Sequence, residues 1–169
     1  MRVLGLDPGS LRTGWGLVEP SPDGRRLNLV AGGTIVSPAA WPFSERLRHI
    51  FEQTKDVIAR FAPAELAVEG VFTAHNARTA ILLGQARGVA LLAGALAGLA
   101  IHEYAPAAVK KALVGTGRAG KEQVRAMVEA ILKQTLPPPK EFSLDASDAL
   151  AIAVCHLHSR KLKNLGGRP

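Results

Sequence analysis

The chain has 169 residues, a length typical of one domain, and 47% of them are apolar, which excludes a disordered chain. Its single cysteine, Cys155, excludes an internal disulfide and any zinc site built on several cysteines. The 21 basic and 14 acidic side chains give a net charge of +7, and a small basic domain favours a polyanionic partner, most often nucleic acid.

The first third of the chain predicts three strands joined by tight turns. These strands are expected over residues 3–6, 13–18 and 27–36. The turns between them are Pro8-Gly9-Ser10 and Ser21-Pro22-Asp23-Gly24, and turns of this kind between successive strands are typical of an antiparallel meander. The first strand ends at a carboxylate, Asp7.

The rest of the chain alternates helical patterns with two short strands. Helices are expected over 44–61, 76–99, 107–114, 122–133 and 144–162, and strands over 66–68 and 101–104. Ser44 is the predicted N-cap of the first helix. This order of elements predicts an α/β fold in which helices flank a mixed sheet of five strands. Residues 1–162 are expected to form a single domain, and the basic residues 163–169 a disordered tail.

The helix expected over 76–99 is apolar almost all round after Arg87. A helix that is apolar on all sides must be covered on all sides. It therefore lies either in the middle of the core or against a second subunit. Its glycines place small residues on one face, which permits close approach of another helix. We favour a homodimer that forms through Asn76–Leu99.

Four carboxylates fall where such a fold would bring them together. Asp7 and Glu69 each end an apolar strand, and both emerge at the same sheet edge if these strands are neighbours. Asp145 and Asp148 share one face of the last helix, because they are three residues apart. Clustered carboxylates repel one another unless a cation lies among them, and oxygen ligands suit Mg²⁺ or Mn²⁺. In a basic protein, two such ions are a known arrangement for cutting phosphodiesters.

Three of these acids also have a simpler explanation when each is taken alone. Asp145 can be a helix N-cap, Asp148 can interact with the helix dipole, and Asp7 can form a turn. Two histidines are not assigned to the site: His102 is expected to be a surface or packing residue, and His156 lies about two turns beyond Asp148.

The basic charge is concentrated in the second half of the chain. Residues 1–85 carry nine basic and eight acidic side chains, whereas residues 86–169 carry twelve and six. We therefore expect the second half to supply the surface that faces phosphates. The longest apolar run has 14 residues, short of the roughly 20 needed to span a bilayer. A cytoplasmic protein with no membrane partner is expected.

Several short segments follow one another in a recognisable order. They are 6–10, 13–16, 68–72, 83–88, 109–111, 114–117 and 145–153. Together, from residue 1 to about 158, they resemble the RuvC family of Holliday junction resolvases. The resemblance implies an RNase H-like fold and a homodimer in which each subunit nicks one of two like-polarity strands of a four-way DNA junction. Such paired nicks serve recombination and DNA repair.

The resemblance also assigns residues. It implies that Asp7, Glu69, Asp145 and Asp148 are catalytic and hold two Mg²⁺ ions, with Mn²⁺ as a substitute, in a hydrolysis that leaves a 5′ phosphate and a 3′ hydroxyl. It further implies a branch-migration motor as partner and a bacterial cytoplasm, near the nucleoid, as location. One departure is Gly70, where family members often carry Gln.

The resemblance and the residues together suggest contacts with DNA. Phe72 is expected to stack on unpaired bases, and Lys110 and Lys121 match lysines near the scissile strand. Arg118 lies in a glycine-rich loop that suits close approach to phosphates, and Arg78 is a further candidate.

Three other functions deserve comparison. A RuvC-like nuclease that acts on RNA or on another branched DNA shares the Asp-Pro-Gly opening, and competition between substrates would separate it. An actin-like or sugar-kinase ATPase needs two lobes and a second phosphate loop, which 169 residues cannot hold. A non-catalytic DNA-binding module would not need the four acids.

Overall fold

The computed structural model describes residues 1–70 and 76–166. Within these ranges five strands form one sheet in the order β3-β2-β1-β4-β5. The strands are β1 (Val3–Asp7), β2 (Arg12–Pro20), β3 (Leu27–Val36), β4 (Glu65–Glu69) and β5 (Ala100–Tyr104). The first three pair as an antiparallel meander, whereas β1, β4 and β5 are parallel. The predicted mixed sheet of five strands is therefore confirmed.

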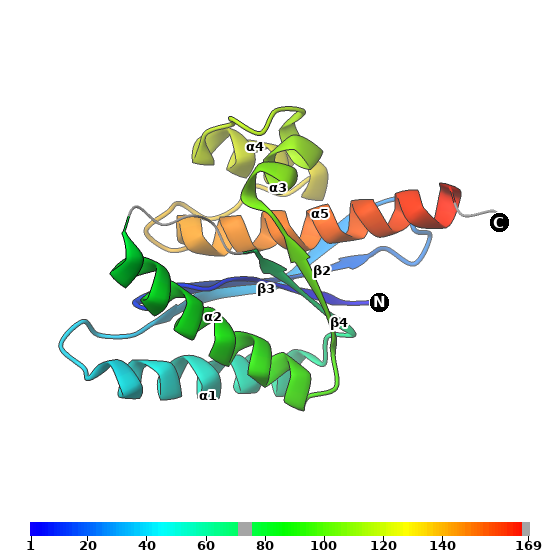
Figure 1. Cartoon of the computed structure of the whole chain (residues 1–169). Helices are drawn as coiled ribbons and strands as arrows, with labels where there is room; N and C mark the ends of the chain where they lie inside the picture. The colour runs from blue at the N-terminus through cyan, green and yellow to red at the C-terminus, as the bar shows by residue number, and fades with distance from the viewer. Residues whose placement is uncertain (71–75, 167–169) are drawn as a thin grey trace.

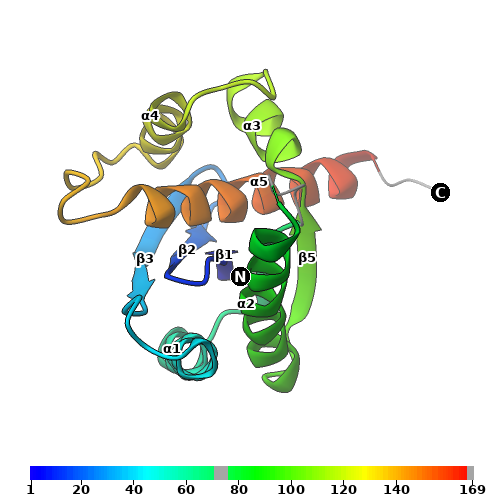
Figure 2. The ribbon, with the colours of Figure 1, turned by 60° about the vertical axis from the view of Figure 1, so that its left-hand side comes forward.

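The helices form layers on both faces of this sheet (Figures 1 and 2). They are α1 (Phe43–Phe61), α2 (Ala77–Leu96), α3 (Pro106–Val114), α4 (Lys121–Leu132) and α5 (Leu144–Gly166). Helices α1 and α2 cover one face, and α5 crosses the other, with α3 and α4 packed on its outer side. This arrangement leaves α5 between the sheet and a small helical cap.

Alternation along the strands decides which residues meet α5. Leu66 and Val68 of β4 are fully buried in the cluster with α1 and α2, whereas Ala67 is buried in the cluster with α5. Since successive side chains point to opposite faces, Glu65 and Glu69 share the α5 face with Ala67. The same alternation on β1 places Asp7 on the α5 face.

Helix α5 lies directly on the backbone of the sheet at two strand glycines. A Cβ atom added at Gly5 would lie 2.0 Å from the carbonyl oxygen of Ala149, and one added at Gly14 would lie 2.0 Å from that of Asp145. No side chain fits such a gap, so only glycine permits this approach. The first turns of α5 are therefore held close above β1 and β2.

Several predicted helix ends are wrong. Helix α1 begins at Phe43 with Pro42 as its N-cap and no side-chain cap, so Ser44 lies inside the helix and does not cap it. Helix α5 continues to Gly166, four residues beyond its predicted end at 162, because no breaking residue interrupts the pattern there. Residues 163–166, expected in the disordered tail, are therefore helical.

Helix α2 is only partly covered by the rest of the chain. Ala86, Ala90 and Ala93 are buried, but Leu92 and Leu96 are 50% and 69% exposed. By length and composition alone α2 would pass as a membrane-spanning helix, with an 18-residue window of mean hydropathy 1.5 that is 22% buried. The alternative that this helix lies in the middle of the core is therefore wrong.

Candidate active site

The four predicted acids lie around one cavity. Strands β1 and β4 are parallel with Leu6 opposite Val68, so Asp7 and Glu69 follow side by side at their carboxyl ends. Helix α5 begins above this edge and contributes Asp145 and Asp148. All four line a cavity of about 820 Å³. The predicted convergence of two strand ends with one helix face is therefore what the fold produces.

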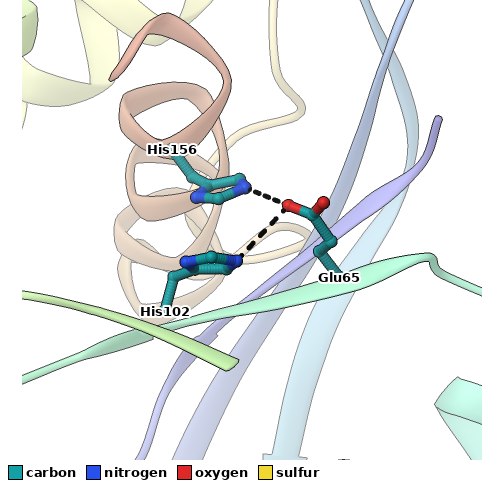
Figure 3. A group of neighbouring side chains, drawn as sticks. All are labelled: Glu65, His102 and His156. Atoms are coloured by element: carbon teal, nitrogen blue, oxygen red, sulfur yellow. Dashed lines mark hydrogen bonds and ion pairs between the residues drawn. The ribbon is translucent and has the colours of Figure 1, made fainter. Parts of the chain in front are cut away.

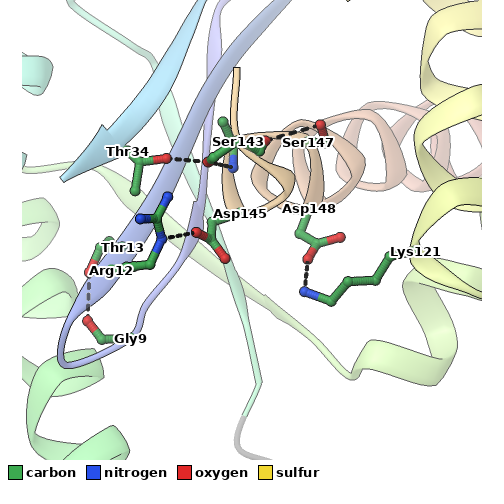
Figure 4. Close-up of polar contacts among 10 residues, drawn as sticks. Gly9, Arg12, Thr13, Thr34, Lys121, Ser143, Asp145, Ser147 and Asp148 are labelled. Atoms are coloured by element: carbon green, nitrogen blue, oxygen red, sulfur yellow. Dashed lines mark hydrogen bonds and ion pairs between the residues drawn. The ribbon is translucent and has the colours of Figure 1, made fainter. Parts of the chain in front are cut away.

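A serine network fixes the start of α5 (Figure 4). Ser143 Oγ accepts a hydrogen bond from the Ala146 backbone N–H at 3.2 Å and contacts the hydroxyl of Thr34 on β3. Arg125 of α4 donates to Ser147 Oγ at 2.8 Å. Ser143, not Asp145, thus supplies the side-chain cap of α5, which leaves the carboxylate of Asp145 available for the cavity.

Two cations hold the acids of α5 (Figure 4). Arg12 Nε donates to Asp145 Oδ2 at 2.7 Å, and Lys121 Nζ donates to Asp148 Oδ2 at 2.6 Å. Both cationic side chains are more than half exposed, so competing ions and phosphates can reach these pairs. Sequence reasoning missed Arg12, because only the placement of α5 over the start of β2 brings it to Asp145.

Arg87 of α2 fixes the backbone that carries Glu69. Its Nε donates to the Glu69 carbonyl oxygen at 3.0 Å, and its guanidinium pairs with Glu103 of β5 at 2.5 Å. The Gly70 backbone N–H donates to the Tyr104 carbonyl oxygen at 2.8 Å, so the residue after Glu69 is anchored although it departs from the family pattern. Arg87 therefore positions Glu69. It does so from α2, whose opposite side is exposed.

The electrostatics of the acids fit a cation site. Burial, reinforced by the neighbouring Glu69 and Asp148 carboxylates, raises the pKa of Asp7 to about 8. Burial also raises the pKa of Glu69, and Asp148 adds to that effect. Carboxylates that resist ionisation together become good ligands once a divalent ion balances their charge. An all-oxygen donor set of this kind suits Mg²⁺ or Mn²⁺.

The raised pKa of Asp7 predicts a stability that falls with pH when no metal is bound. In the unfolded chain this carboxyl has the ordinary value of 3.8, so the folded state binds the extra proton and its contribution is lost as pH rises through about 8. Urea unfolding in EDTA should show a loss of about 1.4 kcal/mol between pH 7 and pH 9, which is the last part of a larger fall that begins near pH 4. Mg²⁺ should restore the loss, and Asp7→Asn should abolish it; an unchanged midpoint in EDTA across this range would contradict the assignment.

The residues predicted to contact DNA are distributed unevenly. Lys110 and Lys121 line the cavity beside the acids. Arg78 and Arg118 are exposed and do not line it. Phe72 lies outside the described residues. The geometry thus brings two of the four described candidates beside the acids, whereas the two arginines are outside the lining of the cavity.

Comparison with known proteins gives a consistent result. The model of the family "Crossover junction endodeoxyribonuclease RuvC" matches residues 3–156. The protein of that name from Maricaulis maris is 47% identical to this chain, over 98% of this chain and 96% of that protein. The one from Pelobacter propionicus is 51% identical, over 96% of this chain and 89% of that protein.

The solved structures agree. Thermus thermophilus RuvC superposes with a TM-score of 0.82 at 35% identity, covering 95% of this chain and 96% of that one. The same protein in complex with a Holliday junction substrate gives 0.81 at 32% identity over the same shares. The yeast mitochondrial Holliday junction resolvase, at 10% identity, 96% and 85% coverage and a TM-score of 0.66, shares the fold. With its mixed sheet, its four converging acids and these relatives, the chain belongs to the RuvC family.

Proposed function

We propose that this chain is a metal-dependent endodeoxyribonuclease that resolves four-way DNA junctions in recombination and DNA repair. The observation that carries the proposal is the meeting of four acids from β1, β4 and α5 in one cavity that Lys110 and Lys121 also line. Acids alone would repel a phosphate backbone, whereas acids that hold cations beside lysines attract it. The relatives' names and the junction complex of the Thermus thermophilus protein point to the same substrate.

In this proposal Asp7, Glu69, Asp145 and Asp148 hold two Mg²⁺ ions, which Mn²⁺ can replace. When bound, such ions supply the activation of water and the stabilisation of the leaving 3′ oxygen, so that the products carry a 5′ phosphate and a 3′ hydroxyl. Lys121, which pairs with Asp148 beside the acids, would bind a phosphate oxygen. Arg87, through the Glu69 carbonyl, keeps the Glu69 carboxylate in position.

Cleavage of a synthetic four-way junction tests the proposal. With each strand labelled in turn, we expect Mg²⁺-dependent nicks at symmetric positions on two strands of like polarity, with 5′ phosphates that a ligase can seal. Competition with linear duplex, a three-way junction and structured RNA separates the alternative, a RuvC-like nuclease for RNA or another branched DNA. Preferred cutting of any of these competitors, or scattered nicks, would contradict junction resolution.

The exposed face of α2 supports a homodimer. Ile81, Gly88, Leu92 and Leu96 recur at intervals of seven, four and four residues and so share one side of the helix. The leucines and Ile81 are 50–69% exposed, and a Cβ atom added at Gly88 meets open space. A second copy of α2 would cover this stripe and could approach closely at the glycine. Two chains would then supply the two active sites that paired nicks require.

Leu96→Glu is expected to weaken this dimer. A charge placed at a buried apolar contact must be desolvated without a partner, so the variant should elute as a monomer at micromolar concentration and should cut junctions without coordinating the two nicks. Val36→Glu, at another exposed apolar residue (52% exposed, on β3), is the control and should remain dimeric. A dimeric Leu96→Glu protein by light scattering would count against the α2 interface.

The cellular setting follows from the same proposal. An enzyme for chromosomal junctions would work in the bacterial cytoplasm at the nucleoid. We also propose that a branch-migration motor complex is its partner, because such a motor moves a junction to the sites where a resolvase cuts. Co-purification with the motor on junction DNA, compared with the motor on duplex DNA, tests this partner.

A further inference from the structure

A second cluster of metal-ligating side chains lies away from the four acids (Figure 3). Glu65 at the start of β4, His102 on β5 and His156 on α5 each present one ligand atom, and these atoms lie within 4.8 Å of one another. Glu65 Oε2 is 2.6 Å from His156 Nε2 and 3.5 Å from His102 Nε2. Both imidazoles thus point the same nitrogen at one carboxylate oxygen.

This cluster is separate from the acid cavity. Glu65 precedes Glu69 by four residues on the same strand, a distance of about 13 Å at the usual rise of a strand. Neither histidine nor Glu65 lines the cavity that holds the acids. Glu65 and His156 are 8% and 3% exposed, whereas the side chain of His102 is 40% exposed, so the cluster is enclosed on two sides and can be reached by an ion from solvent on the third.

The groups around the cluster orient it in the way that metal sites are oriented. His156 Nδ1 lies 2.8 Å from the Tyr104 hydroxyl, and Arg160 bonds the second carboxylate oxygen of Glu65. Outer partners of this kind fix the ring of a ligating histidine and occupy the carboxylate oxygen that faces away from the ion. Three convergent donors and two outer partners therefore come from β4, β5 and α5.

Protonation favours an ion as well. Burial lowers the pKa of His156, and although burial raises the pKa of Glu65, hydrogen bonds from His156 and Arg160 bring it below its usual value. Near neutral pH the cluster thus holds a neutral imidazole beside a carboxylate, the forms that bind metal. The charged and titratable groups that face His156 are Arg160, His102, Glu65 and the Tyr104 hydroxyl.

We propose that Glu65, His102 and His156 bind one divalent transition-metal ion of the Zn²⁺ type. Imidazole nitrogen with one carboxylate oxygen is a donor set that suits Zn²⁺ and related ions and does not suit Mg²⁺. Four-coordinate geometry with bonds near 2.1 Å separates neighbouring donors by about 3.4 Å. The His102–Glu65 separation of 3.5 Å matches that value, and the His156–Glu65 separation of 2.6 Å needs to open by less than about 1 Å.

Besides this small opening, binding requires a change of tautomer at His156. The proton on Nε2, which now faces Glu65, moves to Nδ1, where the Tyr104 oxygen accepts it, and the freed Nε2 lone pair binds the ion. The ion would join α5 to β4 and β5. The alternative is that the cluster is an ion pair that ties α5 to the sheet and binds no metal.

Zinc titration separates these two readings. EDTA-treated protein is dialysed and titrated with ZnCl₂ in a calorimeter with Mg²⁺ in large excess, which keeps the all-oxygen site occupied. We expect one Zn²⁺ per chain, and a loss of affinity of about 100-fold or more in His102→Ala. His102 is partly exposed, so its truncation leaves no buried void. His49→Ala, a histidine of α1 on the other face of the sheet, should bind as the parent does.

Three further measurements distinguish the metal site from the ion pair. Co²⁺ in place of Zn²⁺ should give the visible absorption of a four-coordinate site in the parent and lose it in His102→Ala. The melting temperature should rise by roughly 5 °C at Zn²⁺ concentrations near 100 times Kd, and Mg²⁺-dependent cleavage should be unchanged in His102→Ala. Equal Zn²⁺ affinity of the parent and His102→Ala, or no stoichiometric binding to the parent, would leave only the ion pair and overturn the proposal.

Discussion

Asp7→Asn is expected to lower Mg²⁺-dependent cleavage of a four-way junction at least about 10³-fold, a loss of about 4 kcal/mol of transition-state stabilisation. Asp7 lies beside Glu69 and faces the start of α5, so removal of its charge would take a proposed metal ligand from the centre of the cluster. Binding of the junction should persist, because phosphate contacts come from basic side chains. Single-turnover cleavage and a gel-shift titration of the same preparation measure the two quantities.

The matched control is Asp56→Asn on α1. Asp56 is exposed and lies on the helix that covers the opposite face of the sheet, so the same chemical change should leave cleavage and binding as they are. If Asp7→Asn cuts at a rate within about tenfold of the parent, the four acids do not form the active site. If it loses junction binding in parallel with cleavage, Asp7 acts in folding or in DNA contact.

Gly14→Ala is expected to give the largest loss of stability among conservative single changes. The added Cβ atom would lie 2.0 Å from the Asp145 carbonyl oxygen and 2.3 Å from its carbonyl carbon. Because both are backbone atoms, α5 must move as a whole, and overpacking of this kind costs about 1–3 kcal/mol or more. Asp145 would move with the backbone, so cleavage should fall even at temperatures where the variant stays folded. Urea unfolding and cleavage rates measure both effects.

Gly16→Ala separates a backbone clash from a side-chain clash. The nearest atoms to its added Cβ are Leu150 Cδ2 at 2.6 Å and Cγ at 2.7 Å. Truncation by Leu150→Ala should therefore restore part of the stability lost in Gly16→Ala, beyond the sum expected for independent changes. The same Leu150→Ala change should restore nothing in Gly14→Ala. Equal rescue of both variants would contradict direct contact between α5 and the strand backbone at Gly14.

The acids of the site were predictable because local patterns place them. Asp7 and Glu69 end short apolar strands, and Asp145 and Asp148 are spaced for one helix face. The ends of the strands are therefore enough to predict the first pair, and helical periodicity is enough to predict the second. Their partners needed tertiary structure. Arg12 meets Asp145 across 133 positions of sequence, and no local pattern marks an arginine that follows a turn. Helix caps could not be predicted from local sequence either. Ser143 and Ser44 both have side chains that can cap a helix, but only Ser143, which contacts Thr34 of β3, does so in the fold.

The ion pairs of Arg12 with Asp145 and of Lys121 with Asp148 would couple the proposed binding of metal to the binding of substrate. Without metal, each of these cations neutralises one carboxylate of α5. An ion held by Asp145 and Asp148 would free both cations to face the mouth of the cavity, where a phosphate could bind them. Metal and DNA should therefore increase each other's affinity, and this coupling is reciprocal by thermodynamic necessity. The metal-bound form, which is the form able to cut, would then bind the junction most tightly.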